Sequence, residues 1–354
     1  MNAFEPITLS NLTLKNRFVR SATHDYMQQE DGLISEDQLD LYEQLALNEV
    51  GMIITGHLYV SSEGRASADQ NSIANDEVLP NLIELVKRVI PHGSAIIAQL
   101  AHAGAKARVD RPVGPSPLTL RDDVTCHGLT IEEIEQIKES FILAALRAKK
   151  AGFTGVQVHM AHGYLLSEFT TPEHNWRTDQ YGQTVENRFR LGRDIILGIK
   201  EACGKDYPVF VKINSNVVTN DEAYEQDLVY ILNQCHSLNV EAVELSGCDL
   251  FQKKRPDHLY YLERAARLKQ QVEIPLILVG GIRTLEDVNQ VLAAGIELVS
   301  MSRPFICEPD LIQRFKEEHD SKCLTCNGCY GLYYRKGKEC VLHPNPLNRS
   351  HEKE

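Results

Sequence analysis

Two histidines and a tyrosine follow one apolar run of the sequence, in the segment GVQVHMAHGY. They are His159, His162 and Tyr164. Histidines three residues apart at the end of a strand can converge on one point, where they could donate hydrogen bonds to an oxyanion or bind a metal. A single such histidine is more often a structural residue with satisfied hydrogen bonds. The group of three indicates a functional site.

Polar side chains also accompany other apolar runs. Gln99 lies near the end of one run and Lys212 within another, while Thr23, His24 and Tyr26 follow a third. An amide can pair with the donor and acceptor atoms on the edge of a planar heterocycle, and a lysine can sit beside an electron-rich carbonyl. The alternative is that these side chains form polar layers inside the core of a barrel.

The nine cysteines are unevenly distributed. Five are scattered and look like ordinary thiols: Cys126, Cys203, Cys235, Cys248 and Cys307. The other four crowd a C-terminal segment with the spacing C-x2-C-x2-C-x10-C: Cys323, Cys326, Cys329 and Cys340. Four thiolates at this spacing suit an iron–sulfur cluster or a tetrahedral zinc. Free or stabilising thiols are the third interpretation.

The elements that would position these residues follow from the hydrophobic pattern. Short apolar, β-branched runs alternate with amphipathic segments, which is typical of a parallel sheet with crossover helices. Eight runs are expected as strands: 18–22, 52–60, 95–100, 155–160, 209–214, 242–246, 276–280 and 298–302. The helical patterns between them include 36–48, 81–90, 131–151, 186–202, 227–238, 260–270 and 285–294.

Eight strands, each followed by a helix, predict an α/β fold of the (β/α)8 TIM barrel type, whose active site lies at the C-terminal ends of the strands. A doubly wound sheet is the alternative, but it usually has fewer strands, and no G-x-G-x-x-G follows an early run. Residues 1–319 would form the barrel. Residues 320–354, which carry the four clustered cysteines and a polar tail, would form a C-terminal appendage.

Helix start and stop signals support several of these segments. Ser35 with Gln38 and Thr130 with Glu133 have the spacing of capping boxes. Gly152 follows two lysines, at a position where a left-handed helix end favours glycine. These residues predict where two helices begin and where one ends.

The last two runs end as LVGGIR and SMSRP. In a TIM barrel the loops after strands seven and eight are the usual phosphate site, to which Gly280, Gly281, Ser302 and Arg303 would contribute. One face of the barrel would then carry a phosphate site, side chains that can pair with the edge of a heterocycle, and a group of hydrogen-bond donors. This combination implies a phosphorylated planar cofactor such as FMN. Pyridoxal phosphate is the alternative, for which Lys212 would be the Schiff-base candidate.

Composition excludes several classes of protein. The chain has 354 residues with 37 Lys and Arg against 49 Asp and Glu, a net charge of −12, which disfavours a sequence-independent nucleic-acid binder. Its 43% hydrophobic and 24% charged residues are ordinary for a globular protein. No run approaches a membrane span, and the N-terminal residues lack the pattern of a signal peptide. We therefore expect a cytoplasmic protein with a small-molecule partner, and a homo-oligomer is compatible with the sequence.

The sequence resembles the old yellow enzyme family of FMN-dependent ene-reductases over about residues 3–315. The similarity rests on the GG and SRP elements and on four longer motifs: LKNRFVRSAT (14–23), IIAQLAHAG (96–104), VHMAHGYLLSEFTTPEHNWRTDQYGQTVENRFR (158–190) and FVKIN (210–214). The third motif is long and specific. The resemblance implies FMN as cofactor, NAD(P)H as co-substrate and an activated alkene as substrate.

The resemblance also assigns roles around the flavin. Ala22 and Thr23 would pass along its ring, and Gln99 would read its pyrimidine edge. Lys212 would stand near flavin N1 and O2, where the family often has an arginine. The phosphate would be held by the glycine pair and the residues after the last strand: Gly280, Gly281, Ser302 and Arg303.

At the substrate, the resemblance implies that His159 and His162 hydrogen-bond the carbonyl oxygen while hydride passes from flavin N5 to the β-carbon. Tyr164 would protonate the α-carbon. Tyr26 matches a tyrosine that lines the substrate pocket in one bacterial branch. His24 stands where related bacterial enzymes often have Cys or Thr beside the flavin, so the flavin potential would be tuned differently.

The cysteine segment resembles that of the 2,4-dienoyl-CoA reductase and trimethylamine dehydrogenase branch, although its later spacings look about one residue shorter. In that branch an iron–sulfur cluster exchanges electrons with FMN. A flavin and iron–sulfur electron-transfer protein or a dienoyl-CoA reductase-like protein is therefore one alternative function. A metal-dependent barrel hydrolase that uses His159 and His162 as ligands is another.

Overall fold

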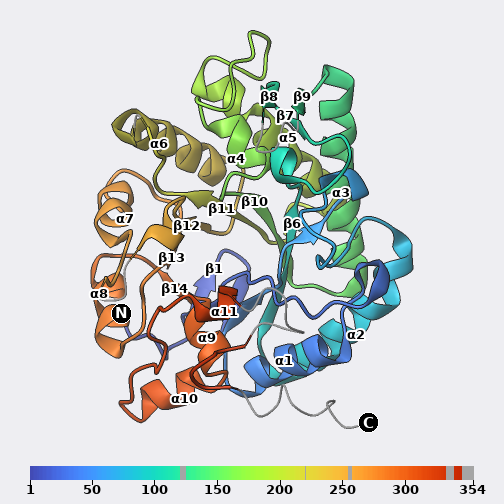
Figure 1. Cartoon of the computed structure of the whole chain (residues 1–354). Coiled ribbons are helices and arrows are strands. Elements are labelled where there is room, and N and C mark those ends of the chain that lie inside the picture. Colours follow the sequence, from blue (N-terminus) through green and yellow to red (C-terminus); the bar gives the residue numbers. More distant parts are fainter. Residues whose placement is uncertain (120–124, 220, 254–256, 332–338, 345–354) are drawn as a thin grey trace.

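The computed structural model describes residues 1–119, 125–219, 221–253, 257–331 and 339–344 (Figure 1). Within them, eight parallel strands pair side by side and close on themselves, because β10 pairs with β6 as well as with β11. The barrel strands are β3 (Phe18–Arg20), β4 (Met52–Ile54), β6 (Ala95–Ala101), β10 (Gly155–Met160), β11 (Val209–Asn214), β12 (Val243–Ser246), β13 (Leu276–Val279) and β14 (Leu298–Met301). The predicted TIM barrel is confirmed, and the doubly wound alternative is wrong because the sheet is closed.

Helices surround this barrel (Figure 1). They are α1 (Glu36–Leu47), α2 (Leu79–Val89), α3 (Ile131–Ala151), α5 (Val185–Cys203), α6 (Asp221–Ser237), α7 (Leu262–Lys269) and α8 (Leu285–Ala293). Capping boxes at Ser35 and Thr130 begin α1 and α3 as predicted, and Gly152 ends α3 with φ 93°. Helix α6 begins six residues before the predicted 227, at Asp221.

The run predicted as a strand over 52–60 is divided in the structure. Strand β4 ends at Ile54, and β5 (Leu58–Tyr59) pairs with the end of β6 after a short connection. This connection contains Gly56 and His57. The residues on both sides of this connection are buried, as the apolar run predicts. The backbone between them does not pair with a neighbouring strand of the sheet, so the run does not form one strand.

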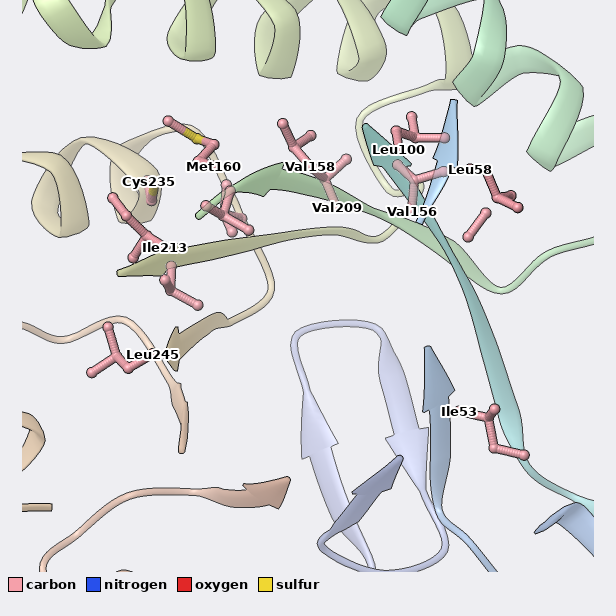
Figure 2. Close-up of a cluster of buried hydrophobic side chains, with 14 of the residues drawn as sticks. Ile53, Leu58, Leu100, Val156, Val158, Met160, Val209, Ile213, Cys235 and Leu245 are labelled. Carbon is pink, nitrogen blue, oxygen red and sulfur yellow. The ribbon is translucent and has the colours of Figure 1, made fainter. Parts of the chain in front are cut away.

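Alternating side chains of each strand face the helices or the barrel interior. Val156, Val158 and Met160 of β10 belong to the large cluster between barrel and helices, and Figure 2 shows Val158 and Met160 pointing from the sheet toward the surrounding helices. The intervening Gln157 and His159 therefore face inward. This alternation is what delivers polar side chains to the interior of the barrel.

An N-terminal hairpin of β1 (Ile7–Leu9) and β2 (Leu12–Leu14) closes one end of the barrel. Its Leu9 and Leu14 pack in a second apolar cluster with side chains near the starts of the barrel strands, such as Phe210. The interior is thus apolar at this end and becomes polar toward the C-terminal ends of the strands. The site can form only at that polar end.

Shorter elements lie in the connections between the barrel strands. A small sheet of β7 (Val113–Gly114), β8 (Leu118–Thr119) and β9 (Thr125–Gly128) follows β6, and α4 (Leu165–Thr170) follows β10. The 3-10 turns are η1 (Glu30–Gly32), η2 (Ser62–Gly64), η3 (Asp76–Val78), η4 (Ile90–His92), η5 (Gly104–Lys106) and η7 (Leu250–Gln252). None of the helices in the described residues is long and apolar enough to cross a membrane.

The C-terminal part contains α9 (Arg303–Cys307), α10 (Leu311–Lys316) and α11 (Gly328–Gly331). The segment after α10 runs back along the barrel, where the amide of Ser321 donates to the carbonyl of Arg283 at 2.9 Å and the hydroxyl of Ser321 bonds Glu308 at 2.9 Å. Helix α11 consequently lies beside α9 (Figure 1). The division of the chain at residue 319 stays a prediction.

Candidate active site

A cavity of about 610 Å³ opens at the C-terminal ends of the barrel strands. It is lined by residues from most of the strand ends, which are far apart in the sequence. All of the residues predicted to bind the cofactor or to act in catalysis line it: Ala22, Thr23, Tyr26, Gln99, His159, His162, Tyr164, Lys212, Gly280, Gly281, Ser302 and Arg303. The structure therefore brings the whole predicted set together.

Lys212 lies inside the barrel, where it lines the cavity and forms a buried ion pair. Its Nζ lies 3.1 Å from Oε2 of Glu244, and it donates to the hydroxyl of Ser21 at 2.8 Å. Ser21 and Ser300 each donate to Oε1 of Glu244 at 2.7 Å. Burial raises the pKa of Glu244, but Lys212 and the hydrogen bonds outweigh it, so that the pKa lies below its usual value. Glu244 is therefore an anion that fixes the position of the lysine.

The amide of Gln99 is held by the same network. Its Nε2 donates to Oε1 of Gln157 at 2.7 Å, and Nε2 of Gln157 donates to Glu244 at 3.0 Å. The backbone N–H of Gln99 also donates to Thr55 at 3.0 Å. An amide with its orientation fixed in this way can present a defined donor and acceptor pattern to the edge of a ring.

The two histidines lie close together at the end of β10, with ring centroids 5.3 Å apart. His162 has a left-handed backbone (φ 63°), its amide donates to Asn214 at 3.0 Å, and its Nε2 lies 2.8 Å from the hydroxyl of Ser246. Burial lowers the pKa of His162 to about 3, with Lys212 contributing. This imidazole is neutral at physiological pH.

His159 is buried as well and carries an unsatisfied nitrogen. Burial, and then the nearby His162 and Lys212, hold its pKa well below the usual value. Its Nδ1 has no hydrogen-bond partner among the described residues. An unpaired buried polar atom on a cavity wall costs free energy unless a ligand satisfies it. His159 is thus a neutral imidazole on the cavity lining with one ring nitrogen not engaged by the described residues.

Aromatic and imidazole rings form the adjoining wall. The ring of Tyr164 is 5.1 Å from that of His159, and the ring of Tyr26 stacks on that of His24 at 3.8 Å. His57 lies between these pairs, with its Nε2 2.9 Å from the hydroxyl of Tyr164. The predicted catalytic residues thus share one wall of the cavity, together with a histidine that was not predicted.

The predicted phosphate site lies at the opposite wall, after β13 and β14. Gly280 and Gly281 have φ of 134° and 73°, and a Cβ atom on Gly281 would come within 2.6 Å of the ring of Tyr260. The hydroxyls of Ser302 and Thr23 are 2.7 Å apart. Side chains larger than hydrogen are therefore excluded at the glycine pair, which keeps its backbone accessible.

Arg303 links this wall to the cysteine-rich segment. Its Nη1 donates to Oδ1 of Asn327 at 2.6 Å, and its guanidinium lies 5.9 Å from the ring centroid of Tyr260. Tyr330 from α11 also lines the cavity, hydrogen-bonds Ser302, and has its pKa raised by burial. The C-terminal segment therefore forms part of the site.

These residues fit FMN. Buried Lys212 and oriented Gln99 offer a cation and an amide to a polar ring edge. The glycine pair, Ser302 and Arg303 offer backbone, hydroxyl and guanidinium donors to a phosphate. The Schiff-base role that pyridoxal phosphate would require of Lys212 fits poorly, because its ammonium is already paired with Glu244.

The four clustered cysteines do not line the cavity. Cys323 and Cys329 are half-buried, Cys326 is exposed and Cys340 is buried. Cys307, which looked like an ordinary thiol in the sequence, hydrogen-bonds Cys340. Among the described residues no group of three or more His, Cys, Asp and Glu side chains has a metal-binding arrangement. Metal binding by the four cysteines stays a prediction.

Several residues of the site were missed by sequence reasoning. His57, Lys106, Ser246 and Cys248 line the cavity. Lys106 follows the IIAQLAHAG motif by two residues, and its Nζ donates to the carbonyl of His162 at 2.6 Å. Ser246 ends a predicted strand, so the rule applied to the other strand ends could have found it. His57 gave no such signal, because it lay inside a run interpreted as one strand.

Comparisons with known proteins agree with this geometry. The model of the NADH:flavin oxidoreductase / NADH oxidase family matches residues 2–322. An NADPH dehydrogenase of Bacillus cytotoxicus is 33% identical over 86% of this chain and 89% of its own length. An NADH oxidase of Thermoanaerobacter brockii is 32% identical over 97% of this chain, which spans only 56% of that relative.

A solved structure shares the fold and part of the sequence. The old yellow enzyme homologue of Zymomonas mobilis superposes with a TM-score of 0.81 at 27% identity, over 91% of this chain and 94% of its own. The predicted FMN-dependent, NAD(P)H-linked oxidoreductase is thereby confirmed, and a metal-dependent hydrolase is not supported. The chain belongs to the NADH:flavin oxidoreductase / NADH oxidase family, to which the old yellow enzymes are related by both sequence and fold.

Proposed function

We propose that this enzyme uses NAD(P)H to reduce the C=C bond of an α,β-unsaturated carbonyl compound. The observation that carries the proposal is the grouping of His159, His162 and Tyr164 on one wall of the cavity, where the ring of His159 lies 5.3 Å from that of His162 and 5.1 Å from that of Tyr164. Such a group of neutral donors suits a carbonyl oxygen that gains negative charge during the reaction. The relatives described above support the same class of chemistry.

The proposed cofactor site uses the residues that line the cavity. Gln99 and Lys212 would bind the pyrimidine edge of FMN, with Ala22 and Thr23 along the ring. The phosphate would be bound at the other wall by the backbone of Gly280 and Gly281 together with Ser302 and Arg303. FMN, when bound, supplies the hydride that it receives from NAD(P)H. Lys212 would then stabilise negative charge beside it.

Three side chains would act on the substrate. His159 and His162 would donate hydrogen bonds to the carbonyl oxygen, because both imidazoles are neutral and one ring nitrogen of each can carry a proton. Preorganised donors are worth most where charge develops in a site with little water. The hydroxyl of Tyr164 would give its proton to the α-carbon, and Tyr26 would shape the pocket.

Turnover on a panel of enones, maleimides and enoyl-CoA esters tests this proposal. The enzyme loaded with FMN should bleach on adding NADPH or NADH and recover its flavin absorbance on adding the alkene substrate. A bleached enzyme that reduces none of these compounds would instead favour an electron-transfer protein. Preference for enoyl-CoA esters would favour the dienoyl-CoA reductase-like alternative.

Other predictions from the sequence are retained as proposals. We propose a small-molecule substrate with no nucleic-acid or membrane partner, a cytoplasmic location, and an appendage at residues 320–354 whose cysteines bind an iron–sulfur cluster or zinc. Assembly into a homo-oligomer also stays a prediction. Size-exclusion chromatography with light scattering would measure the oligomeric state directly.

A further inference from the structure

His57 is placed to act on Tyr164. Its Nε2 lies 2.9 Å from the tyrosine hydroxyl, and the two rings are nearly parallel, with an interplanar angle of 19° and centroids 5.5 Å apart. His57 comes from the connection between β4 and β5, whereas Tyr164 follows β10. Two separate parts of the barrel thus meet at this one hydroxyl.

The direction of this hydrogen bond is set by what Tyr164 must do. A tyrosine that protonates a substrate must point its O–H hydrogen into the cavity, which leaves its oxygen to accept from a neighbour. Nε2 of His57 is at the right distance to be that donor. The hydrogen bond would also stabilise the oxygen as it loses its proton, which matters because an ordinary tyrosine has a pKa near 10.

The surroundings of His57 connect it to solvent. Its side chain is half-buried, unlike that of His159. The ring of His24 lies 4.8 Å from that of His57, and Nε2 of His24 contacts the carbonyl of Asp69. His57 is thus partly accessible to solvent, whereas His159 is buried.

We propose that His57 resupplies the proton that Tyr164 donates to the substrate. As the α-carbon forms its C–H bond, the O–H bond of Tyr164 breaks. The tyrosine oxygen then takes the proton on Nε2 of His57 while Nδ1 takes a proton from a hydronium ion or buffer acid in the solvent, which supplies the one proton that each turnover consumes. His57 is left neutral with its proton on Nδ1, and exchange with the solvent restores the proton on Nε2 before the next turnover. His57 is a positioning and relay residue, and this inference rests on the proposed role of Tyr164.

Two substitutions separate relay from positioning. His57→Ala removes the ring and leaves space for added imidazole, whereas His57→Gln keeps an amide donor near the tyrosine but cannot relay protons. In stopped-flow experiments with FMN-loaded enzyme, H57A should slow enone reduction by reduced flavin at least about tenfold. Its solvent deuterium isotope effect should increase, and imidazole should restore the rate. H57Q should stay slow with and without imidazole.

Three controls distinguish loss of the relay from a general loss of structure or of FMN. Flavin reduction by NADPH needs no proton from Tyr164, so it should slow much less than enone reduction in both variants, and the flavin absorbance of each variant shows that it folds and binds FMN. His236→Ala, at an exposed histidine of α6, is the matched control. In a Tyr164→Phe background, H57A should cause no further decrease in the rate of enone reduction.

Wild-type enone reduction in H57A, or full activity in H57Q, would overturn the relay. A wild-type enzyme that reduces no enone would instead reject the proposed function, and the relay with it.

Discussion

Lys212 and Glu244 form an ion pair inside the barrel, with Nζ and Oε2 3.1 Å apart and side chains that are 3% and 0% exposed. Removing two charges from water is costly, and their attraction together with added hydrogen bonds must compensate. Here the carboxylate also accepts from Ser21, Ser300 and Gln157. The arrangement holds a positive charge at one position of the cavity wall.

Replacing Glu244 by Gln should destabilise the protein strongly. The ammonium of Lys212 would remain buried without its counter-charge, and we expect the free energy of unfolding to fall by about 3–5 kcal/mol. Denaturant titration measures this loss. Glu263→Gln is the control, because its ion pair with Arg267 involves a carboxylate that is 93% exposed. Equal losses in the two variants would contradict a special cost of the buried pair.

Replacing His159 by Ala should separate the two half-reactions. Loss of one hydrogen-bond donor to a developing oxyanion typically slows the step that it serves by about 100-fold. We expect FMN to remain bound and flavin reduction by NAD(P)H to change little, while enone reduction slows greatly. Stopped-flow absorbance of the flavin follows both steps. Two unaffected half-reactions would reject the role of His159.

Glu168 should make stability depend on pH. Burial raises the pKa of this carboxyl, on α4, to about 8, although it accepts from the amide of Ala105 at 3.1 Å. Its contribution to stability is present below the unfolded pKa of about 4.3 and is lost as pH rises toward 8. The stability of Glu168→Gln relative to wild type should therefore grow by up to about 4 kcal/mol between pH 5 and 8.

Thermal or denaturant unfolding at several pH values measures this difference. Above pH 8 the difference should level off, because the carboxyl is then ionised in both states. Gln keeps an oxygen that can accept from Ala105, so the comparison isolates the charge. A difference that stays constant from pH 5 to 8 would show that Glu168 does not titrate as the burial indicates.

The clustered cysteines can be tested by elemental analysis. Anaerobically purified protein should contain iron and sulfide, or zinc, near stoichiometric amounts if Cys323, Cys326, Cys329 and Cys340 hold a metal. Iron with a visible spectrum that persists after FMN removal would identify a cluster. Protein without either metal would leave these residues as thiols, and Cys323→Ser should then change stability only slightly.

The barrel and most of the site were predictable from the sequence for one physical reason. Each barrel strand is an apolar run of recognisable length, and closure carries all strand ends to one face, so Gln99, His159 and Lys212 meet without any detailed knowledge of packing. Strand periodicity then tells which side chains face inward. Local residue types sufficed because the fold supplies the long-range geometry.

Three features could not be predicted from the sequence, each for a different reason. His57 lies where the apolar run 52–60 leaves the sheet between β4 and β5, and apolar composition alone does not show such a break. The N-terminal hairpin of β1 and β2 was not predicted, because its strands, ITL and LTL, alternate apolar and polar residues and form no continuous apolar run like those of the barrel strands. The contact of Cys307 with Cys340 joins residues from separate segments, which only the folded chain brings together.

The hydrogen bond from Arg303 to Asn327, with Tyr330 in the cavity wall, has a thermodynamic consequence. One arginine serves both the proposed phosphate site and the cysteine-rich segment, so a ligand that rearranges either partner changes the free energy of the other. Such coupling is reciprocal. A metal that alters FMN affinity by some factor must have its own affinity altered by the same factor when FMN binds. The two binding equilibria would then be linked, so that loading either site would change the apparent affinity of the other.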